Sequence, residues 1–322
     1  MRLDLFRVIK TKAIARVRVT SHDISTVENW FSEYLAWCTQ HNIQPQDIHN
    51  FDETGFRVGV APGEEVVVPA YITEMYVPMA ENRKSVTVIE SICAIGKEHP
   101  PVITVQGRQH MESWYNEKLS GDELVLLSDS GYTNSELAMI FLEHFIKHTG
   151  AGPDKSKKVL LMDSHISHTT PEFVLRATEM NIHPYPFPSH LTHVMQPLDV
   201  GVFQPYKHWH KKAVQHAMRS LDIDYNIASF FRDIAEIRTN TFKKGTIIRA
   251  FRDSGMWPIN PKEALKKMKV YAPPERLEDT LGIPRTPTKF IHSELKLRHW
   301  QAKIPDLLSS PSAQEWNSWA RG

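Results

Sequence analysis

Residues 157–163, KKVLLMD, constrain the fold of this chain more than any other segment. A run of four apolar residues lies here between two stretches with helical periodicity, residues 135–150 and 171–181. A short apolar run bounded by helices is typical of a strand that is buried on both faces. A carboxylate at the end of such a strand is costly unless it is paired or binds a metal. We therefore predict a covered sheet with Asp163 at the carboxyl end of one strand.

The order of the other segments extends this prediction to the whole fold. Strand-like runs are expected at 48–60 (with a turn at Thr54-Gly55), 85–96, 100–107, 123–128 and 181–187, and helices at 21–42, 199–220, 224–242 and 246–257. In the first helix, the apolar positions with helical spacing are Val27, Trp30, Phe31, Tyr34 and Leu35. Strands that alternate with helices in this way predict an α/β fold, a mixed sheet flanked by helices. Ligands of such sheets gather at the carboxyl ends of the parallel strands.

The composition excludes several classes of protein. Only two cysteines, Cys38 and Cys93, are present, which excludes a disulfide scaffold and a CxxC zinc site. The histidines show neither HExxH nor zinc-finger spacing. No apolar run approaches 18 residues, so we expect an intracellular protein that does not cross a membrane.

The net charge of +1 conceals an uneven distribution. Residues 1–20 contain six Lys/Arg against one acidic residue, and residues 201–270 contain fourteen against six. Two basic regions around an acidic middle suit a polyanionic partner, although a solvated helix face would explain either region alone. Along the helix at 199–220 we expect phosphate contacts from Lys207, His208, Lys211 and Lys212, and core packing from Trp209.

Three acidic residues form the candidate site. Asp52 lies within a strand-like run, Asp163 ends one, and Asp199 lies where a loop meets the basic helix. Asp199 alone would be explained as a helix N-cap. Together, hard oxygen ligands on separate elements suit Mg²⁺ or Mn²⁺. Two such ions can activate a water or a 3′-hydroxyl for in-line displacement at a phosphodiester.

Three sequence blocks contain these acidic residues, NFDETGFRVG, LLMDSHISHTTPEF and HVMQPLDVGVFQPYKHWHKK. They resemble the catalytic blocks of the pogo/Tigger/Jerky branch of the mariner transposases, and AFRDSGMWPINP and Thr286-Pro287-Thr288 resemble its fungal members. The resemblance spans about residues 20–290. It implies a ribonuclease H-like fold and a DDE endonuclease, with Asp52, Asp163 and Asp199 as its first, second and third acid. It further implies Mg²⁺- or Mn²⁺-dependent cleavage of transposon ends, strand transfer, DNA as partner, a nuclear location and a possible homodimer.

Residues near the acids allow a functional and a structural interpretation. His165 and His168 could contact the scissile phosphate or be ordinary loop histidines, and we include His168 among the nucleic-acid-binding candidates. Glu53 is expected on the opposite face of the strand from Asp52. Gln196 and Pro197 are expected to shape the turn before Asp199. Asp129 also follows an apolar run but is not included in the site.

The resemblance also implies a division of the chain. We expect residues 1–20 to be the remnant of a helix-turn-helix DNA-binding region, so that the chain is truncated at its N-terminus. Residues 21–270 would form the catalytic domain, and residues 271–322 a Pro-rich linker with a helical tail. Two alternatives to an active enzyme are a non-catalytic, domesticated DNA- or chromatin-binding protein and a transposon fragment without a cellular task. The complete set of acids favours the enzyme over the domesticated binder.

Overall fold

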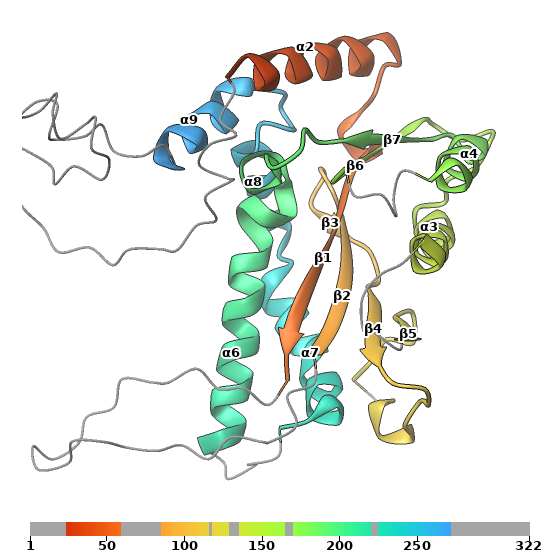
Figure 1. The fold of residues 1–322 in the computed structure, drawn as a ribbon, viewed down its shortest axis with the longest axis vertical. Helices are drawn as coiled ribbons and strands as arrows, with labels where there is room; N and C mark the ends of the chain where they lie inside the picture. Colours follow the sequence, from red (N-terminus) through yellow and green to blue (C-terminus); the bar gives the residue numbers. More distant parts are fainter. Residues whose placement is uncertain are drawn as a thin grey trace, which may run out of the picture. The chain divides into compact units, whose positions relative to one another are not determined.

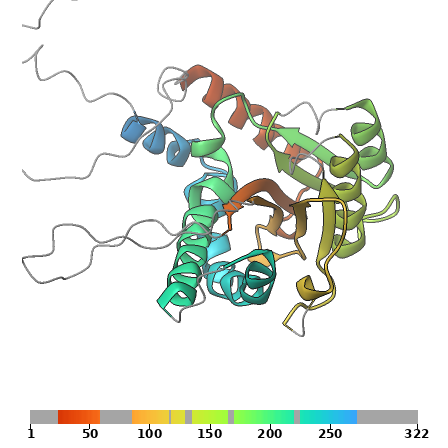
Figure 2. The same ribbon diagram turned by 60° about the horizontal axis from the view of Figure 1, so that its bottom comes forward.

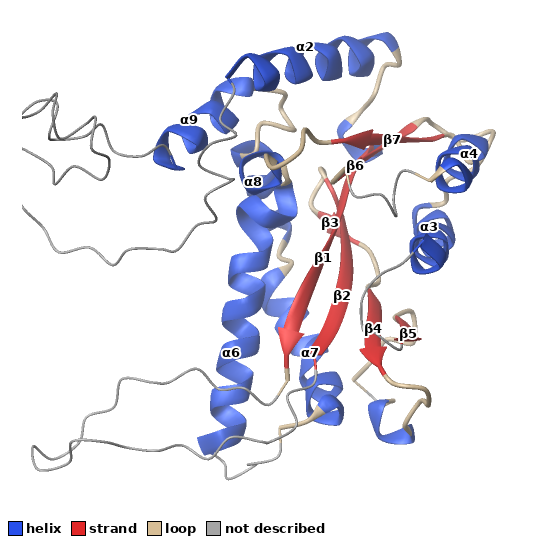
Figure 3. Ribbon diagram, viewed as in Figure 1, coloured by secondary structure: helices blue, strands red, loops and turns tan. Residues whose placement is uncertain are grey.

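The computed structural model describes residues 24–58, 85–115, 118–128, 135–164, 170–219 and 225–271. A sheet of seven strands lies between two layers of helices (Figures 1 and 3), which confirms the predicted α/β class. By its contacts the chain divides into residues 1–272 and 273–322, and every described residue belongs to the first unit. The proposed helical tail and the 1–20 remnant lie outside the described residues.

The sheet combines antiparallel and parallel strand pairs. The strands are β1 (Ile48–Arg57), β2 (Ser85–Cys93), β3 (Lys97–Glu98), β4 (Val102–Gln106), β5 (Leu124–Ser128), β6 (Lys158–Met162) and β7 (Ile182–Pro186). They are ordered β5-β4-β2-β1-β6-β7, with β3 beside β2. β1, β2 and β4 pair antiparallel, whereas β6 is parallel to both β1 and β7. β5 extends this arrangement by pairing parallel with β4.

Helices cover both faces of the sheet (Figure 2). They are α2 (Ile24–Gln40), α3 (Ser135–Thr149), α4 (Pro171–Glu179), α5 (Thr192–Met195), α6 (Phe203–Arg219), α7 (Ile227–Thr241), α8 (Lys244–Asp253) and α9 (Pro261–Tyr271). Shorter turns are η2 (Pro45–Asp47), η3 (Glu112–Trp114) and the π-helical turn η5 (Leu198–Val202). α3 and α4 pack on the face that bears Phe51 and Leu160. α2, α6, α7 and α8 pack on the face that bears Ile48 and Leu161.

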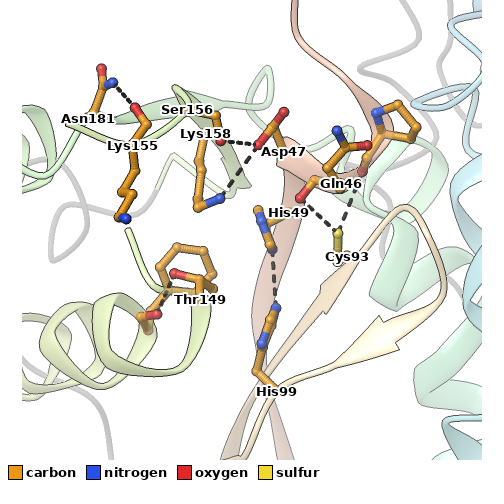
Figure 4. A network of polar contacts seen from close by, with 12 residues as sticks. Gln46, Asp47, His49, Cys93, His99, Thr149, Lys155, Ser156, Lys158 and Asn181 are labelled. Atoms are coloured by element: carbon orange, nitrogen blue, oxygen red, sulfur yellow. Dashed lines mark hydrogen bonds and ion pairs between the residues drawn. The ribbon is translucent and has the colours of Figure 1, made fainter. Parts of the chain in front are cut away.

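A buried ion pair joins the start of β1 to the start of β6 (Figure 4). The Asp47 carboxylate lies 3.5 Å from Lys158 Nζ and accepts a 2.6 Å hydrogen bond from the Ser156 hydroxyl. Both charged residues are less than a tenth exposed. In the parallel ladder that follows, Ile48 aligns with Val159, and two residues later Asn50 aligns with Leu161.

A pair of buried histidines lies close to this ion pair (Figure 4). His99 Nε2 is 3.2 Å from His49 Nδ1, and both rings pack edge-on against Phe145. The second ring nitrogen of each histidine has no hydrogen-bond partner among the described residues. Burial lowers the pKa of both imidazoles, to about 3 for His99. The pair is therefore neutral in the folded protein at neutral pH.

The structure corrects two local predictions. The turn expected at Thr54-Gly55 is absent, because β1 continues through both residues, which pair with Val88 and Thr87 of β2. A strand partner therefore overrides the local turn signal. Leu35 is 51% exposed and not part of the core, and Cys38 is buried instead. Among the described residues, no helix is long and apolar enough to cross a membrane.

The histidine pair predicts a loss of stability in acid. Unfolding returns each imidazole to its ordinary pKa near 6.5, so the unfolded chain takes up protons as the pH falls below that value, while folded His99 does so only near pH 3. We expect the free energy of unfolding to fall by about 2 kcal/mol for His99 between pH 7.5 and pH 5. Chemical denaturation at both pH values measures this loss.

The substitution His99→Gln should reduce the pH dependence, whereas His208→Gln, at an exposed position of α6, should not. An unchanged pH dependence in His99→Gln would contradict the assignment.

Candidate carboxylate site

The three predicted acids come from three different elements on one side of the sheet. Asp52 lies within β1, Asp163 directly follows β6, and Asp199 is the second residue of η5. All three are partly buried. The β1–β6 register, extended by two residues, places Asp52 level with Asp163. In a parallel pair, residues level with each other share a face, so both acids belong to the face that α6 covers.

The surroundings of Asp52 disfavour its charged form. Burial and the negative charges of Asp199 and Asp163 raise the pKa of Asp52 well above its ordinary value. The backbone N–H of Glu53, which donates a 2.8 Å hydrogen bond to the Asp52 carboxylate, only partly opposes this shift. A buried carboxylate beside other negative charges is disfavoured in its charged form.

The donor set fits a divalent cation chemically. Carboxylate oxygens are the ligands that Mg²⁺ and Mn²⁺ prefer, and a cation would relieve the repulsion at Asp52. The described residues contain no group of three or more His, Cys, Asp or Glu side chains that could hold a metal ion as it stands.

Two buried amides connect the turn of Asp199 to the sheet. The Asn50 side-chain oxygen accepts a hydrogen bond from the Leu198 N–H at 3.0 Å, and its amide nitrogen donates to the Leu161 carbonyl at 3.0 Å. Gln196 donates to the Phe51 carbonyl at 3.4 Å. Gln196 therefore helps to position the turn, as expected. Asn50 was not predicted, and its only sequence signal is a polar side chain on the same strand face as Asp52.

The N-cap interpretation of Asp199 is wrong. The capping position of η5 is occupied by Pro197, and Asp199 lies inside the first turn. The helix predicted at 199–220 begins with this π-helical turn and continues as α6 from Phe203. An acidic residue in a first turn still interacts favourably with the helix dipole.

η5 also packs against α8 at a very close contact. A Cβ atom added to Gly201 would lie 2.7 Å from Ala250 Cβ and 2.9 Å from Ala250 Cα. Ala250 is buried, so its backbone cannot easily move aside. Glycine is therefore required at position 201 for η5 to approach α8.

A fourth carboxylate lies next to Asp52 but is fully compensated. Glu90 of β2 is the cross-strand partner of Asp52 and is completely buried. It accepts hydrogen bonds from Arg238 Nε and Nη2, both at 3.0 Å, and from the Tyr206 hydroxyl at 2.8 Å. Glu90 is therefore a structural group that connects α6 and α7 to the sheet, and sequence reasoning did not identify it.

The basic candidates lie on the outer face of α6. Lys207, His208, Lys211 and Lys212 are exposed. Lys212 Nζ lies 4.8 Å from the centre of the Trp209 ring, and Trp209 packs against the core as expected. His165, His168 and Asp129 lie outside the described residues.

A cavity of about 510 Å³ lies between α6 and α7. Its lining includes Trp209, Lys212, His216 and Arg232 and none of the three aspartates. The cavity is thus separate from the carboxylate site.

Comparisons with known proteins extend these observations. A family model described as DDE superfamily endonuclease matches residues 82–251. The MFS-type transporter clz9 of Cochliobolus lunatus is 29% identical over 245 residues, which cover 75% of this chain and 26% of that protein. The chain thus spans about a quarter of the length of this relative.

Solved transposase structures show a weaker similarity. The Mos1 strand transfer complex is 11% identical, with 83% of this chain and 68% of that chain covered and a TM-score of 0.48. The Mos1 mariner paired end complex with Mn is 11% identical, with 82% and 67% covered and a TM-score of 0.45.

The close contact at Gly201 predicts a destabilising substitution. Gly201→Ala should lower the free energy of unfolding by about 1–3 kcal/mol, because the new methyl group overlaps Ala250. The double variant Gly201→Ala/Ala250→Gly removes the overlapping Cβ and should recover part of the loss. Denaturation of the four proteins of this double-mutant cycle measures the coupling. Additive effects would show that the two positions do not meet.

Proposed function

The chain belongs to the DDE superfamily endonuclease family, and from this premise we propose that it cleaves DNA at a site formed by Asp52, Asp163 and Asp199. The feature that supports this most is the origin of the three aspartates from β1, β6 and η5 on one side of the sheet, where burial and the charges of Asp199 and Asp163 raise the pKa of Asp52. The pKa of Asp52 is raised, whereas the neighbouring Glu90 is paired with Arg238, and a buried carboxylate in the setting of Asp52 suits a cation supplied from solution.

The three aspartates are the proposed ligands of Mg²⁺ or Mn²⁺. A bound ion would supply Lewis-acid stabilisation of the phosphate and would lower the pKa of an attacking water or 3′-hydroxyl. The chain itself orients the ligands: β1 and β6 fix Asp52 and Asp163 side by side, and the amides of Asn50 and Gln196 hold the turn of Asp199 against them. More specifically, we propose a pogo-like transposase that acts on transposon ends, transfers strands as a homodimer and works in the nucleus.

The exposed face of α6 is the proposed DNA surface. α6 continues directly from η5, so its basic side chains begin eight residues after Asp199 with Lys207. His208, Lys211 and Lys212 extend this face along the helix. Such residues neutralise backbone phosphates without reading bases. His168, five residues after Asp163 in the sequence, is a further candidate contact to the phosphate.

The second candidate function is non-catalytic DNA or chromatin binding. The absence of a ready three-ligand group among the described residues favours it. A binder of this kind would use the basic face of α6 and would not require the aspartates. The two functions therefore differ in their response to loss of a carboxylate.

Loss of one carboxylate should abolish cleavage. We expect Asp163→Asn to lower Mg²⁺-dependent nicking of supercoiled DNA by at least about 100-fold, because a metal ligand is lost while the side-chain volume is kept. Glu53→Gln is the matched control, since Glu53 aligns with Ile89, which belongs to the opposite face of the sheet. Equal nicking by Asp163→Asn and the unsubstituted protein would refute the catalytic proposal. DNA binding without any nicking would support the second function.

Loss of basic residues should weaken DNA binding evenly across sequences. Lys207→Gln together with Lys211→Gln should raise the dissociation constant and reduce the slope of log K against log salt by about 2, one for each lost phosphate contact. Lys266→Gln on α9 is a control, because Lys266 already pairs with Glu263 at 2.8 Å. Fluorescence anisotropy between 50 and 200 mM salt, roughly the range over which such contacts are lost, gives both quantities. A slope unchanged from that of the unsubstituted protein would exclude α6 as the DNA surface.

A further inference from the structure

We propose that Asn50 is a positioning residue that sets the place of the third carboxylate relative to the first two. The inference rests on the proposed function, because it assigns Asn50 a role in the same site. Asn50 lies in the middle of the sheet, two residues before Asp52 and on the same strand face. It is completely buried and therefore does not contact DNA itself.

The amide of Asn50 contacts the chain next to each of the other two acids. Its oxygen accepts from the N–H of Leu198, the residue before Asp199. Its nitrogen donates to the carbonyl of Leu161, two residues before Asp163. These partners are 148 and 111 residues away in the sequence. Asn50 lies in the β1 segment of Asp52, and its side chain hydrogen-bonds to the segments that carry Asp199 and Asp163.

Both ends of the amide are needed for this role. A planar amide offers an acceptor and a donor in fixed relation, so the position of Leu198 is set relative to β6 as well as to β1. An aspartate could not donate to the Leu161 carbonyl, and a leucine would fill the space without either bond. Removal of one partner from a buried hydrogen bond leaves the other unsatisfied, at a cost of about 1–3 kcal/mol.

Other contacts hold the surrounding elements in place, but they do not fix the start of η5 relative to both β1 and β6. The ladder and the Asp47–Lys158 pair already align β1 with β6. The contact of Gly201 with Ala250 holds the far side of η5 against α8. Gln196 provides a parallel but weaker connection, a single 3.4 Å bond to the Phe51 carbonyl, and its oxygen has no partner among the described residues. Asn50 is thus the shorter link from the strand pair to the start of the turn.

The test compares metal affinity with stability. Mn²⁺ is titrated into the full chain without DNA, and free Mn²⁺ is followed by electron paramagnetic resonance. We expect Asn50→Leu to raise the dissociation constant for Mn²⁺ about 10–100-fold, as for other residues that orient metal ligands. Nicking should fall by a similar factor. Thr104→Val is the control, since Thr104 is an equally buried polar residue on β4 whose hydroxyl has no partner among the described residues.

A purely structural role would lower the unfolding midpoint and leave the Mn²⁺ affinity of the folded variant unchanged. That result, with Mn²⁺ binding by the unsubstituted chain intact, would overturn this inference alone. If the unsubstituted chain binds no Mn²⁺, the proposed function fails and this inference with it.

A measurement on the unsubstituted protein covers the case in which Asn50→Leu does not fold. Hydrogen exchange resolved by NMR should show the Leu198 amide strongly protected, because its N–H is bonded to the buried Asn50 oxygen. Exchange at the rate of an unstructured amide would refute the contact and the inference.

Discussion

The parallel pairing of β1 with β6 is the interaction on which the rest of the site depends. It joins two segments that are about a hundred residues apart, and the buried Asp47–Lys158 pair fixes where the ladder begins. A shift of one residue would turn every side chain of β1 to the opposite face. Asp52 would then face α3, and the Asn50 amide would leave Leu161 and Leu198. The positions of Asp52 and Asp163 thus depend on contacts at the starts of β1 and β6, away from the candidate site itself.

Two neighbouring carboxylates on one face of the sheet have very different surroundings. Glu90 and Asp52 are cross-strand partners. The Glu90 carboxylate accepts hydrogen bonds from Arg238 and from the Tyr206 hydroxyl. Its negative charge is therefore paired inside the protein, as the burial of a charge requires. Burial and the negative charges of Asp199 and Asp163 raise the pKa of Asp52. The fold thus pairs one of the two charges internally, and the proposed function assigns the other to a cation from outside.

Much of the fold could be predicted from local patterns, and much of the site could not. The run KKVLLMD contains enough information to place Asp163 after a buried strand, because burial on both faces leaves no polar alternation. The turn predicted at Thr54-Gly55 was wrong, because the turn signal reflects local sequence alone, whereas both residues pair with β2. Asn50 and Glu90 could not be identified, since their partners are more than a hundred residues away and an isolated polar residue in a strand carries no sign of them. Asp199 was found by its resemblance to a family block, not by its local pattern.

The close approach of Gly201 to Ala250 has a consequence for the smallest fragment of the chain that can keep the candidate site in place. The three acids are all present by residue 199, and the recognisable block around the third ends within α6. The surface against which its turn rests belongs to α8, some fifty residues later. A fragment cut after α7 would retain every proposed ligand and yet leave η5 without its support on that side. The part of the chain that supports the candidate site therefore extends at least to the end of α8 at Asp253.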